Sequence, residues 1–209
     1  KDSSQFLGAW QSSEENIPTA GGHGVRRIYT DPTTHLKVTA EVRTYDDFPG
    51  TVDWVVKLRN DGTADTPILE NILPLNWALA ASPGDCFIRH AKGSSAGADD
   101  FMPLEEHFGP NGNDHIESDG ERSSNGNSLP FFNLHTGNHG VIGAIGWTGG
   151  WKVDFHNAPD GKSISMQAGM KTTHLLLHPG EEIRTPRIVL MNWTGGDWQK
   201  SQNAWRRLI

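Results

Sequence analysis

The chain has only one cysteine, Cys86, among its 209 residues. It therefore cannot form an internal disulfide or a metal site built from cysteines. No apolar run approaches the roughly 20 residues that a membrane-spanning helix needs. Basic residues are outnumbered, and the formal net charge of −7 argues against nucleic acid or an anionic membrane as a partner. The compartment stays open, because residues 1–4 fit either a cytoplasmic protein or the new end left by a removed signal peptide.

Glycine, proline and tryptophan are abundant instead. The chain holds 24 glycines, 12 prolines and 8 tryptophans, and its apolar residues come in short runs. This combination is typical of β structure with many turns. At 209 residues the chain is long enough for one large β domain, or two small ones, with a sizeable core.

Alternating apolar and polar residues predict strands. From Leu36 to Val42, and again from Val52 to Leu58, every second residue is apolar, and Asn60-Asp61-Gly62 is a hairpin signal. Further strands are expected over 66–76, 85–91, 130–135, 140–147, 151–156, 162–167, 174–178 and 183–191. We expect an antiparallel two-layer sandwich in which the inward-facing side chains include Val38, Val42, Trp54, Val56, Ile142, Ile145, Leu176 and Val189.

A helix is predicted at the C-terminal end of the chain. Asp197 is a good N-cap, and the residues on one face at helical spacing are Trp198, Trp205, Leu208 and Ile209. No stop signal follows this apolar face. We therefore expect residues 1–196 to form the β-sandwich domain and 197–209 to begin a linker helix towards a further domain. The alternative is a natural C-terminal helix docked on its own sheet.

The segment 120–134 carries the strongest functional signal. Its amides and hydroxyls are groups that hydrogen-bond sugar hydroxyls, and Pro130-Phe131-Phe132 is the expected start of a buried strand that would hold the loop still. An ordinary Asn/Gly/Ser turn is the alternative. The preceding segment, 92–128, is predicted to be one long irregular region. The sugar contacts expected in these loops are Arg122, Ser124, Asn125 and Asn127, with Asp99 and Asp100.

The tryptophans offer a second kind of sugar contact. Trp147 and Trp151 bracket the turn Thr148-Gly149-Gly150, where an exposed indole could stack on a sugar ring. Core packing is the alternative for both. Trp54 and Trp77 lie in apolar strand contexts and are expected in the core.

Catalytic and metal chemistry have little support in the sequence. A retaining glycosidase needs two carboxyl groups about 5–5.5 Å apart across the scissile bond. The acidic pairs in sight are sequence neighbours, which point to opposite faces of an extended segment: Asp46-Asp47, Asp99-Asp100, Glu105-Glu106 and Glu181-Glu182. The ten histidines include no pair with an obvious third ligand, and the acidic residues between 114 and 121 do not follow EF-hand spacing. We expect no metal and no cofactor.

Several motifs in fixed order resemble one known family. The Gly-Glu-Arg-Ser-Ser…Pro-Phe-Phe order within 120–134 is followed by the glycine-rich run 140–152, by Leu-Leu-His-Pro-Gly-Glu-Glu at 176–182, and by Arg-Arg-Leu at 206–208. In this order the motifs are similar to the N-terminal domain of the melibiase-type α-galactosidases, glycoside hydrolase family 36. The likeness is strongest over residues 120–209.

The resemblance implies an all-β fold, the antiparallel β-supersandwich of the galactose-mutarotase type, with one C-terminal helix. It also implies a parent enzyme that is a retaining α-galactosidase, with both catalytic aspartates on a following (β/α)₈ barrel that is not in this chain. The implied partners are an α-galactoside-type carbohydrate, the enzyme's own barrel and other copies in a homo-oligomer. This chain by itself is expected not to hydrolyse an aryl α-galactoside.

Three functions therefore compete. The first is a non-catalytic domain that packs on the barrel and walls the sugar pocket. The second is a free-standing carbohydrate-binding sandwich that uses an exposed Trp147 or Trp151. The third is a small mutarotase-type enzyme, which would need a histidine and a carboxylate converging in one cleft.

Overall fold

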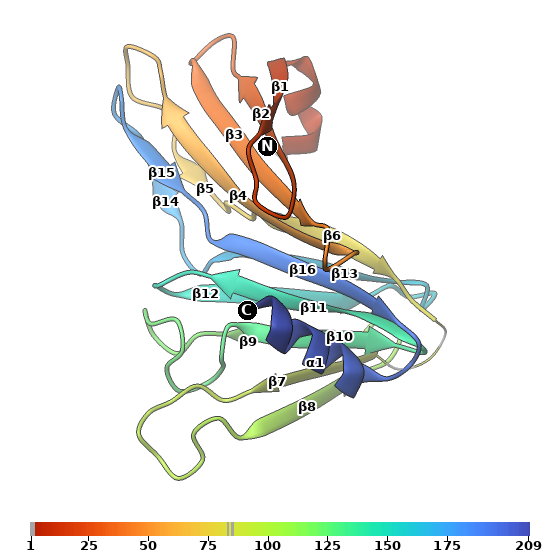
Figure 1. Cartoon of the computed structure of the whole chain (residues 1–209). Coiled ribbons are helices and arrows are strands. Elements are labelled where there is room, and N and C mark those ends of the chain that lie inside the picture. Colours follow the sequence, from red (N-terminus) through yellow and green to blue (C-terminus); the bar gives the residue numbers. More distant parts are fainter. Residues whose placement is uncertain (1–2, 83, 85) are drawn as a thin grey trace.

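The computed structural model describes residues 3–82, 84 and 86–209. Within this part of the chain the fold is an antiparallel sandwich of two main sheets with one α-helix, which confirms the predicted all-β supersandwich (Figure 1). Residues 1 and 2, and residue 85 at the start of the predicted strand 85–91, lie outside the described residues. No described helix has the length and apolar character that crossing a membrane requires.

The large sheet has ten strands in the described residues. Its spatial order is β1 (Gln11–Ile17), β2 (Gly22–Thr30), β3 (Leu36–Tyr45), β4 (Thr51–Asn60), β16 (Arg187–Thr194), β11 (His139–Gly146), β10 (Phe131–Thr136), β7 (Cys86–Ala91) and β8 (Pro103–Phe108), with β15 (Glu182–Arg184) also paired to β4. The second sheet runs β6 (Leu75–Ala80), β13 (Ser163–Met170), β12 (Trp151–Asn157) and β9 (Asn113–Glu117). A small third sheet pairs β5 (Leu69–Glu70) with β14 (His174–Leu175).

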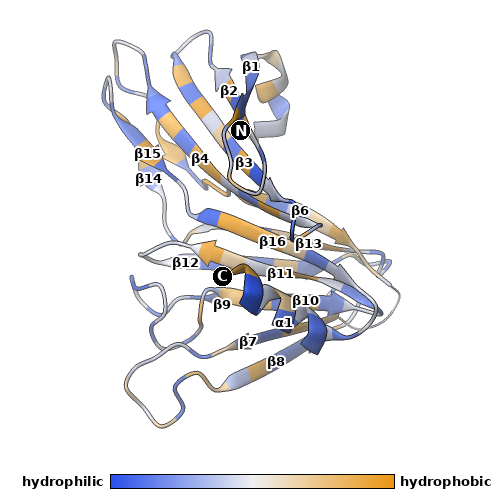
Figure 2. Cartoon of the chain, in the orientation of Figure 1, coloured by the Kyte–Doolittle hydropathy of each residue, from blue (hydrophilic) through white to orange (hydrophobic). Residues whose placement is uncertain are grey.

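The largest core lies between the two main sheets. Every second residue of a strand points to the same face, so the inner faces of both sheets contribute apolar side chains to one cluster. Fully buried members include Ile88, Leu134, Ile145, Phe155 and Met166. Figure 2 shows hydrophobic stretches along β16 and β11 in the middle of the large sheet. Burying one such side chain contributes about 1.5–3 kcal/mol, and this layer holds the two sheets together.

The opposite face of the large sheet is covered in part by helix α1 (Trp198–Leu208), as Figure 1 shows. Asp197 caps the helix as predicted, because its Oδ1 accepts a hydrogen bond of 3.0 Å from the Lys200 amide. Trp205 is buried against Ile142 and Trp193. Ile145 faces the core between the two sheets as expected. Ile142 lies three residues away on β11 and faces the helix, as does Val189, so the expectation that these two point into the sandwich is wrong.

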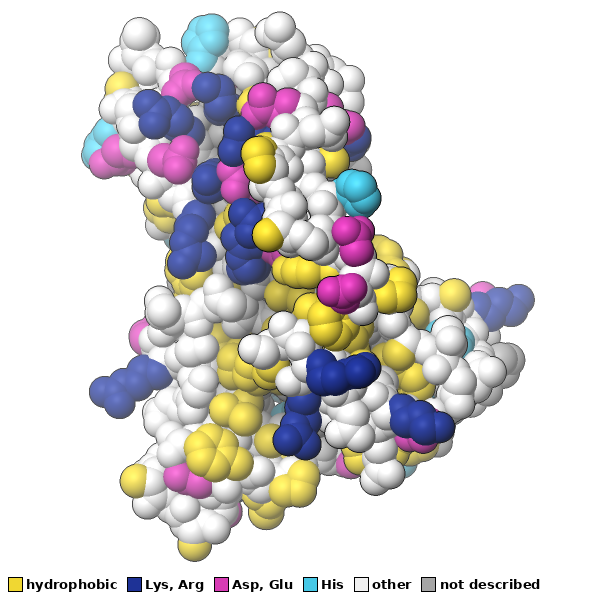
Figure 3. Space-filling view, in the orientation of Figure 1, with side chains coloured by type: hydrophobic (Ala, Val, Ile, Leu, Met, Phe, Trp, Pro, Cys, Tyr) yellow, Lys and Arg dark blue, Asp and Glu magenta, His cyan; other side chains and the backbone are white. Residues whose placement is uncertain are grey.

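The strands β1 to β4 form the N-terminal part of the large sheet. Their inner face packs on the small third sheet, in a cluster around Leu36, Leu58 and Leu177. The outer face carries charges of both signs in pairs, including Arg26 with Glu41, and Figure 3 shows this mixture over the upper part of the molecule. The 3₁₀ turns η1 (Ser3–Gln5) and η2 (Leu7–Ala9) precede β1.

Three further expectations, two about the core and one about the bounds of a strand, are wrong. Leu176 is 36% exposed and Leu177 is buried at 2%, because Leu175 and Leu177 both point into the cluster around Leu36 and Leu58, and Leu176 between them points the other way. Trp77 is 39% exposed although it lies on the same face of β6 as the buried Leu75 and Leu79, because β6 is an edge strand of the second sheet and leaves one side of the indole uncovered. The predicted strand 183–191 is two strands, β15 and β16. Pro186, which has no backbone N–H, lies between them.

The segment 92–128 is also not one irregular region. It contains β8 and β9, which are the edge strands of the two main sheets. Most side chains of β8 are exposed, so its sequence lacks the apolar alternation that marks a half-buried strand. For the same reason the sequence does not predict β1, whose first six residues are all exposed.

Candidate functional site: a polar cavity at the open edge of the sandwich

A cavity of about 480 Å³ lies between the edge strands β8 and β9. These two strands belong to different sheets, so no ladder of backbone hydrogen bonds closes the sandwich here. Side chains of β7, β8 and β9 line the inner part, and the loops that contain residues 92–100 and 126–128 line the mouth. The cavity thus lies where the core of the sandwich opens to solvent.

The two mouth loops are fastened to each other by backbone hydrogen bonds. The Gly93 amide donates to the Gly126 carbonyl at 3.0 Å, and the Ser94 amide donates to the Ser124 carbonyl at 2.9 Å. A Cβ atom on Gly93 would clash with the Ser124 carbonyl oxygen, so the approach requires glycine. Gly126 has a φ of +60°, which a side chain would also disfavour.

Asp100 organises the first mouth loop. Its carboxylate accepts hydrogen bonds from the Ser94 hydroxyl at 2.6 Å and from the amides of Ser95 at 3.0 Å and Gly97 at 3.2 Å. The Ser94 hydroxyl, followed by the Ser95 amide, holds the pKa of Asp100 below its usual range. An ionised Asp100 therefore fixes the loop conformation, and its oxygens are already engaged within the protein.

Trp151 anchors the second mouth loop from below. Its indole is fully buried in the main core, and its Nε1 donates a 2.7 Å hydrogen bond to the Ser123 carbonyl. Its backbone amide donates to the Ser118 hydroxyl at 3.0 Å. The expectation that Trp151 could stack on a sugar is therefore wrong, because no ring face reaches the surface.

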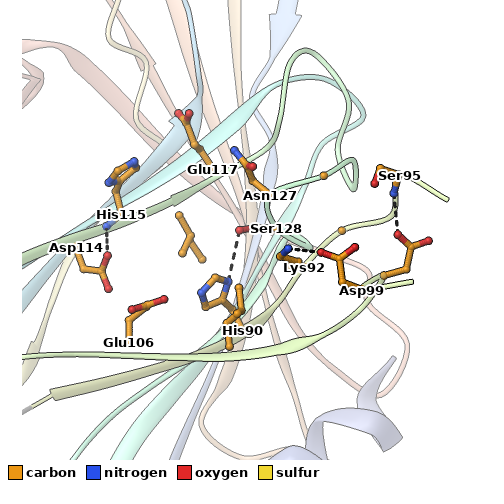
Figure 4. Close-up of a pocket in the computed structure, with 15 residues that line it drawn as sticks. His90, Lys92, Ser95, Asp99, Glu106, Asp114, His115, Glu117, Asn127 and Ser128 are labelled. Atoms are coloured by element: carbon orange, nitrogen blue, oxygen red, sulfur yellow. Dashed lines mark hydrogen bonds and ion pairs between the residues drawn. The ribbon is translucent and has the colours of Figure 1, made fainter. Parts of the chain in front are cut away.

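Three titratable groups converge inside the cavity. His90 of β7, Glu106 of β8 and Asp114 of β9 point towards the same space (Figure 4). Burial lowers the pKa of the His90 imidazole, and the negative charges of Glu106 and Asp114 offset part of that effect. The His90 Nδ1 lies 3.4 Å from the Ser128 hydroxyl. The cavity therefore favours the uncharged form of the His90 imidazole, beside two acidic side chains.

The other charged groups of the cavity are already paired. Lys92 forms an ion pair with Asp99, and Lys171 pairs with Glu117 at 2.9 Å. Among the described residues, Glu106 and Asp114 have no basic partner at salt-bridge distance. Asp114 Oδ1 already accepts a 2.7 Å hydrogen bond from the His115 amide. Asp114 Oδ2 and the Glu106 carboxyl can accept hydrogen bonds from a ligand that offers hydroxyl or ammonium donors.

The structure brings together only some of the residues predicted to bind sugar. Asp99, Asp100 and Asn127 line the cavity. Ser124 and Asn125 lie in the second mouth loop and contribute backbone carbonyls to loop packing, while Arg122 is exposed and outside the lining. Trp147 packs partly against the core, with the Arg184 guanidinium 5.2 Å from its ring centroid.

Sequence reasoning missed His90, Glu106 and Asp114. A signal for His90 was present, since Cys86, Ile88 and His90 alternate in one strand and the first two are fully buried. An inward histidine at the end of such a series is unusual enough to single out. In the described part of the chain, no group of three or more His, Cys, Asp or Glu side chains is arranged to hold a metal ion.

No protein-family model and no curated protein sequence matches the chain. Solved structures do match its fold. The glycoside hydrolase family 36 α-galactosidase AgaA from Geobacillus stearothermophilus superposes with a TM-score of 0.66 at 16% identity, over 89% of this chain and 28% of that chain. The α-galactosidase from Lactobacillus brevis gives a TM-score of 0.70 at 12% identity, over 89% of this chain and 27% of its own.

A third similar structure is the α-N-acetylgalactosaminidase NagBb from Bifidobacterium bifidum, with a TM-score of 0.57 at 12% identity, over 95% of this chain and 30% of that one. At these identities the likeness establishes the fold, which is the one that the sequence motifs implied. The chain spans less than a third of each of these three enzymes.

Proposed function

We propose that this chain is the non-catalytic β-sandwich domain of a larger glycoside hydrolase similar to the α-galactosidases. The observation that carries the proposal is coverage: 89% of the chain matches the fold of AgaA, and the match takes up only 28% of AgaA. AgaA variants have been solved with stachyose and raffinose. In this proposal residues 1–196 pack on a catalytic (β/α)₈ barrel, and α1 leads towards it.

The polar cavity and its mouth loops are the part of the domain that we propose to wall the sugar pocket. Asn127 offers both donors and acceptors, and the carboxylates of Glu106 and Asp114 offer acceptors without a basic partner of their own. The backbone bonds between the loops hold these groups in place before a ligand arrives, so binding orders little additional chain.

Asn127→Ala tests this role in the full natural protein. Loss of one hydrogen bond to the sugar is expected to raise the Michaelis constant for an α-galactoside about 2- to 10-fold, with little effect on melting temperature. Asn16→Ala is the matched control, because Asn16 is exposed on β1 at the opposite edge of the large sheet. Unchanged kinetics together with a clear drop in melting temperature would mean that the loop makes domain contacts only.

A second candidate is the mutarotase-type enzyme, favoured by the convergence of His90 with Glu106 and Asp114. One of these groups would take the proton of the anomeric hydroxyl while another protonates the ring oxygen. The bond between C1 and the ring oxygen would then open, and reclosure on the other face would give the other anomer.

Polarimetry of freshly dissolved galactose tests this candidate. The purified chain is expected to accelerate the change in optical rotation, and His90→Gln to abolish the acceleration. A rate no faster than in buffer would exclude the candidate.

A further inference from the structure

A second recess, of about 490 Å³, lies on the face of the large sheet that carries α1. We call it the helix groove. One wall is α1, and the others are the neighbouring ends of β7, β8 and β10. Its lining is largely apolar and includes Pro103, Leu129, Phe131, Ile142, Trp205 and Ile209. Unlike the polar cavity, it offers mainly hydrocarbon to a partner.

Large apolar side chains of the groove are exposed to solvent. Phe131 is 37% exposed, although the next three residues of β10 are buried. Ile209 is 77% exposed. On the view in Figure 3, hydrophobic side chains gather around and below α1, and paired charges dominate the upper part. An apolar recess of this kind on an otherwise polar surface marks an interaction site.

Positive charge lies beside the helix groove at the last turn of α1, where Arg206 follows the groove residue Gln202 by four positions and so lies on the same side of the helix. Arg206 and Arg207 lie in the last turn of α1, are exposed, and have no carboxylate partner among the described residues. In contrast, Arg26, Arg27 and Arg89 each pair with a glutamate. The surface that fits this groove therefore has apolar side chains flanked by carboxylates.

We propose that the helix groove is the face on which the catalytic barrel of the same polypeptide docks, with apolar side chains in the groove and a carboxylate opposite Arg206. This inference rests on the proposed function and adds which face of the sandwich meets the barrel. The similar α-galactosidases carry this fold in just over a quarter of their length, so a protein of that size has further chain that can cover the groove. A domain joined through α1 reaches the groove by a short path, because α1 is itself one of its walls.

Hydroxyl-radical footprinting of the full natural protein tests the assignment. Phe131 and Trp77 are a matched pair of aromatic residues in the sandwich, 37% and 39% exposed, and Trp77 lies outside the groove. For each, the oxidation rate in the folded protein is divided by that in denatured protein. The ratio is expected to be about tenfold lower for Phe131 than for Trp77, as for a side chain in an interface core.

Equal ratios for Phe131 and Trp77 would overturn the proposal, and so would a reading frame without a further domain. Protection of Phe131 that fades on dilution would also overturn it, because a second copy would then cover the groove. The variant Phe131→Asp is expected to split thermal unfolding into two transitions, and Trp77→Asp is expected not to.

These readouts do not depend on glycosidase activity. Protection of Phe131 in a protein that cleaves no galactoside would support the docking face and contradict the proposed function. A full-length protein that cleaves galactosides but whose Phe131 is oxidised as fast as Trp77 would support the proposed function and contradict the docking face.

Discussion

Replacing Trp151 with alanine is expected to lower the free energy of unfolding by about 3–5 kcal/mol. The indole is fully buried between the two main sheets. Its removal leaves a cavity that the surrounding β-strands cannot close. It also leaves the Ser123 carbonyl without the 2.7 Å hydrogen bond that it accepts from Nε1. Equilibrium unfolding in urea measures the change.

The loss should also loosen the mouth of the polar cavity. Ser123 belongs to the loop that receives the backbone hydrogen bonds of Gly93 and Ser94, so hydrogen exchange at these two amides should become faster. Trp77→Ala is the matched control, with a smaller expected cost because Trp77 is 39% exposed and Trp151 is fully buried. A Trp151 variant no less stable than the Trp77 variant would contradict the anchoring role.

Asn133→Ala is expected to cost about 2–3 kcal/mol and to release α1 from the sheet. Asn133 is 1% exposed. Its Oδ1 accepts a 3.0 Å hydrogen bond from the Trp193 indole, and its Nδ2 donates to the Ser201 hydroxyl at 3.3 Å and to the Gln202 carbonyl at 3.2 Å. Alanine would leave the Trp193 Nε1 buried without an acceptor, which costs about 1–3 kcal/mol by itself.

Denaturant unfolding gives the cost of Asn133→Ala, and hydrogen exchange of the α1 amides reports whether the helix loosens. Asn192→Ala is the control on the nearby strand β16, since Asn192 is exposed and its side chain bonds only the Gly50 carbonyl, at 3.2 Å. If α1 exchanges at the same rate in both variants, Asn133 does not hold the helix.

The strands that sequence reasoning located have at least one buried face. In β4, the residues from Val52 to Leu58 alternate, and the structure places Trp54 against the main core and Val56 against the N-terminal cluster. A period of two is visible wherever one face meets a core. The helix α1 was equally readable, because Asp197 caps it and its apolar residues recur at helical spacing.

Strands at the edges were not readable. The faces of β1 and β8 are mostly solvated, so nothing in their sequences selects alternating apolar residues. In the short segment 174–178 the phase of the alternation was also not predicted: Leu177 is in the core and Leu176 is not. The loop anchor was half right, since Phe132 is buried at 2% and Phe131 is 37% exposed.

The residues of the candidate site were also predicted only in part from the sequence. Composition and local pattern determined that the chain is a β-sandwich with a C-terminal helix, and the order of its polar loop motifs pointed to residues Asp99, Asp100 and Asn127. Only the tertiary structure placed His90, Glu106 and Asp114 around one cavity. They lie on three strands, two of which end different sheets. Long-range strand pairing and core packing decide which sheet edges face each other. No local spacing in the sequence can therefore predict that these three residues lie together.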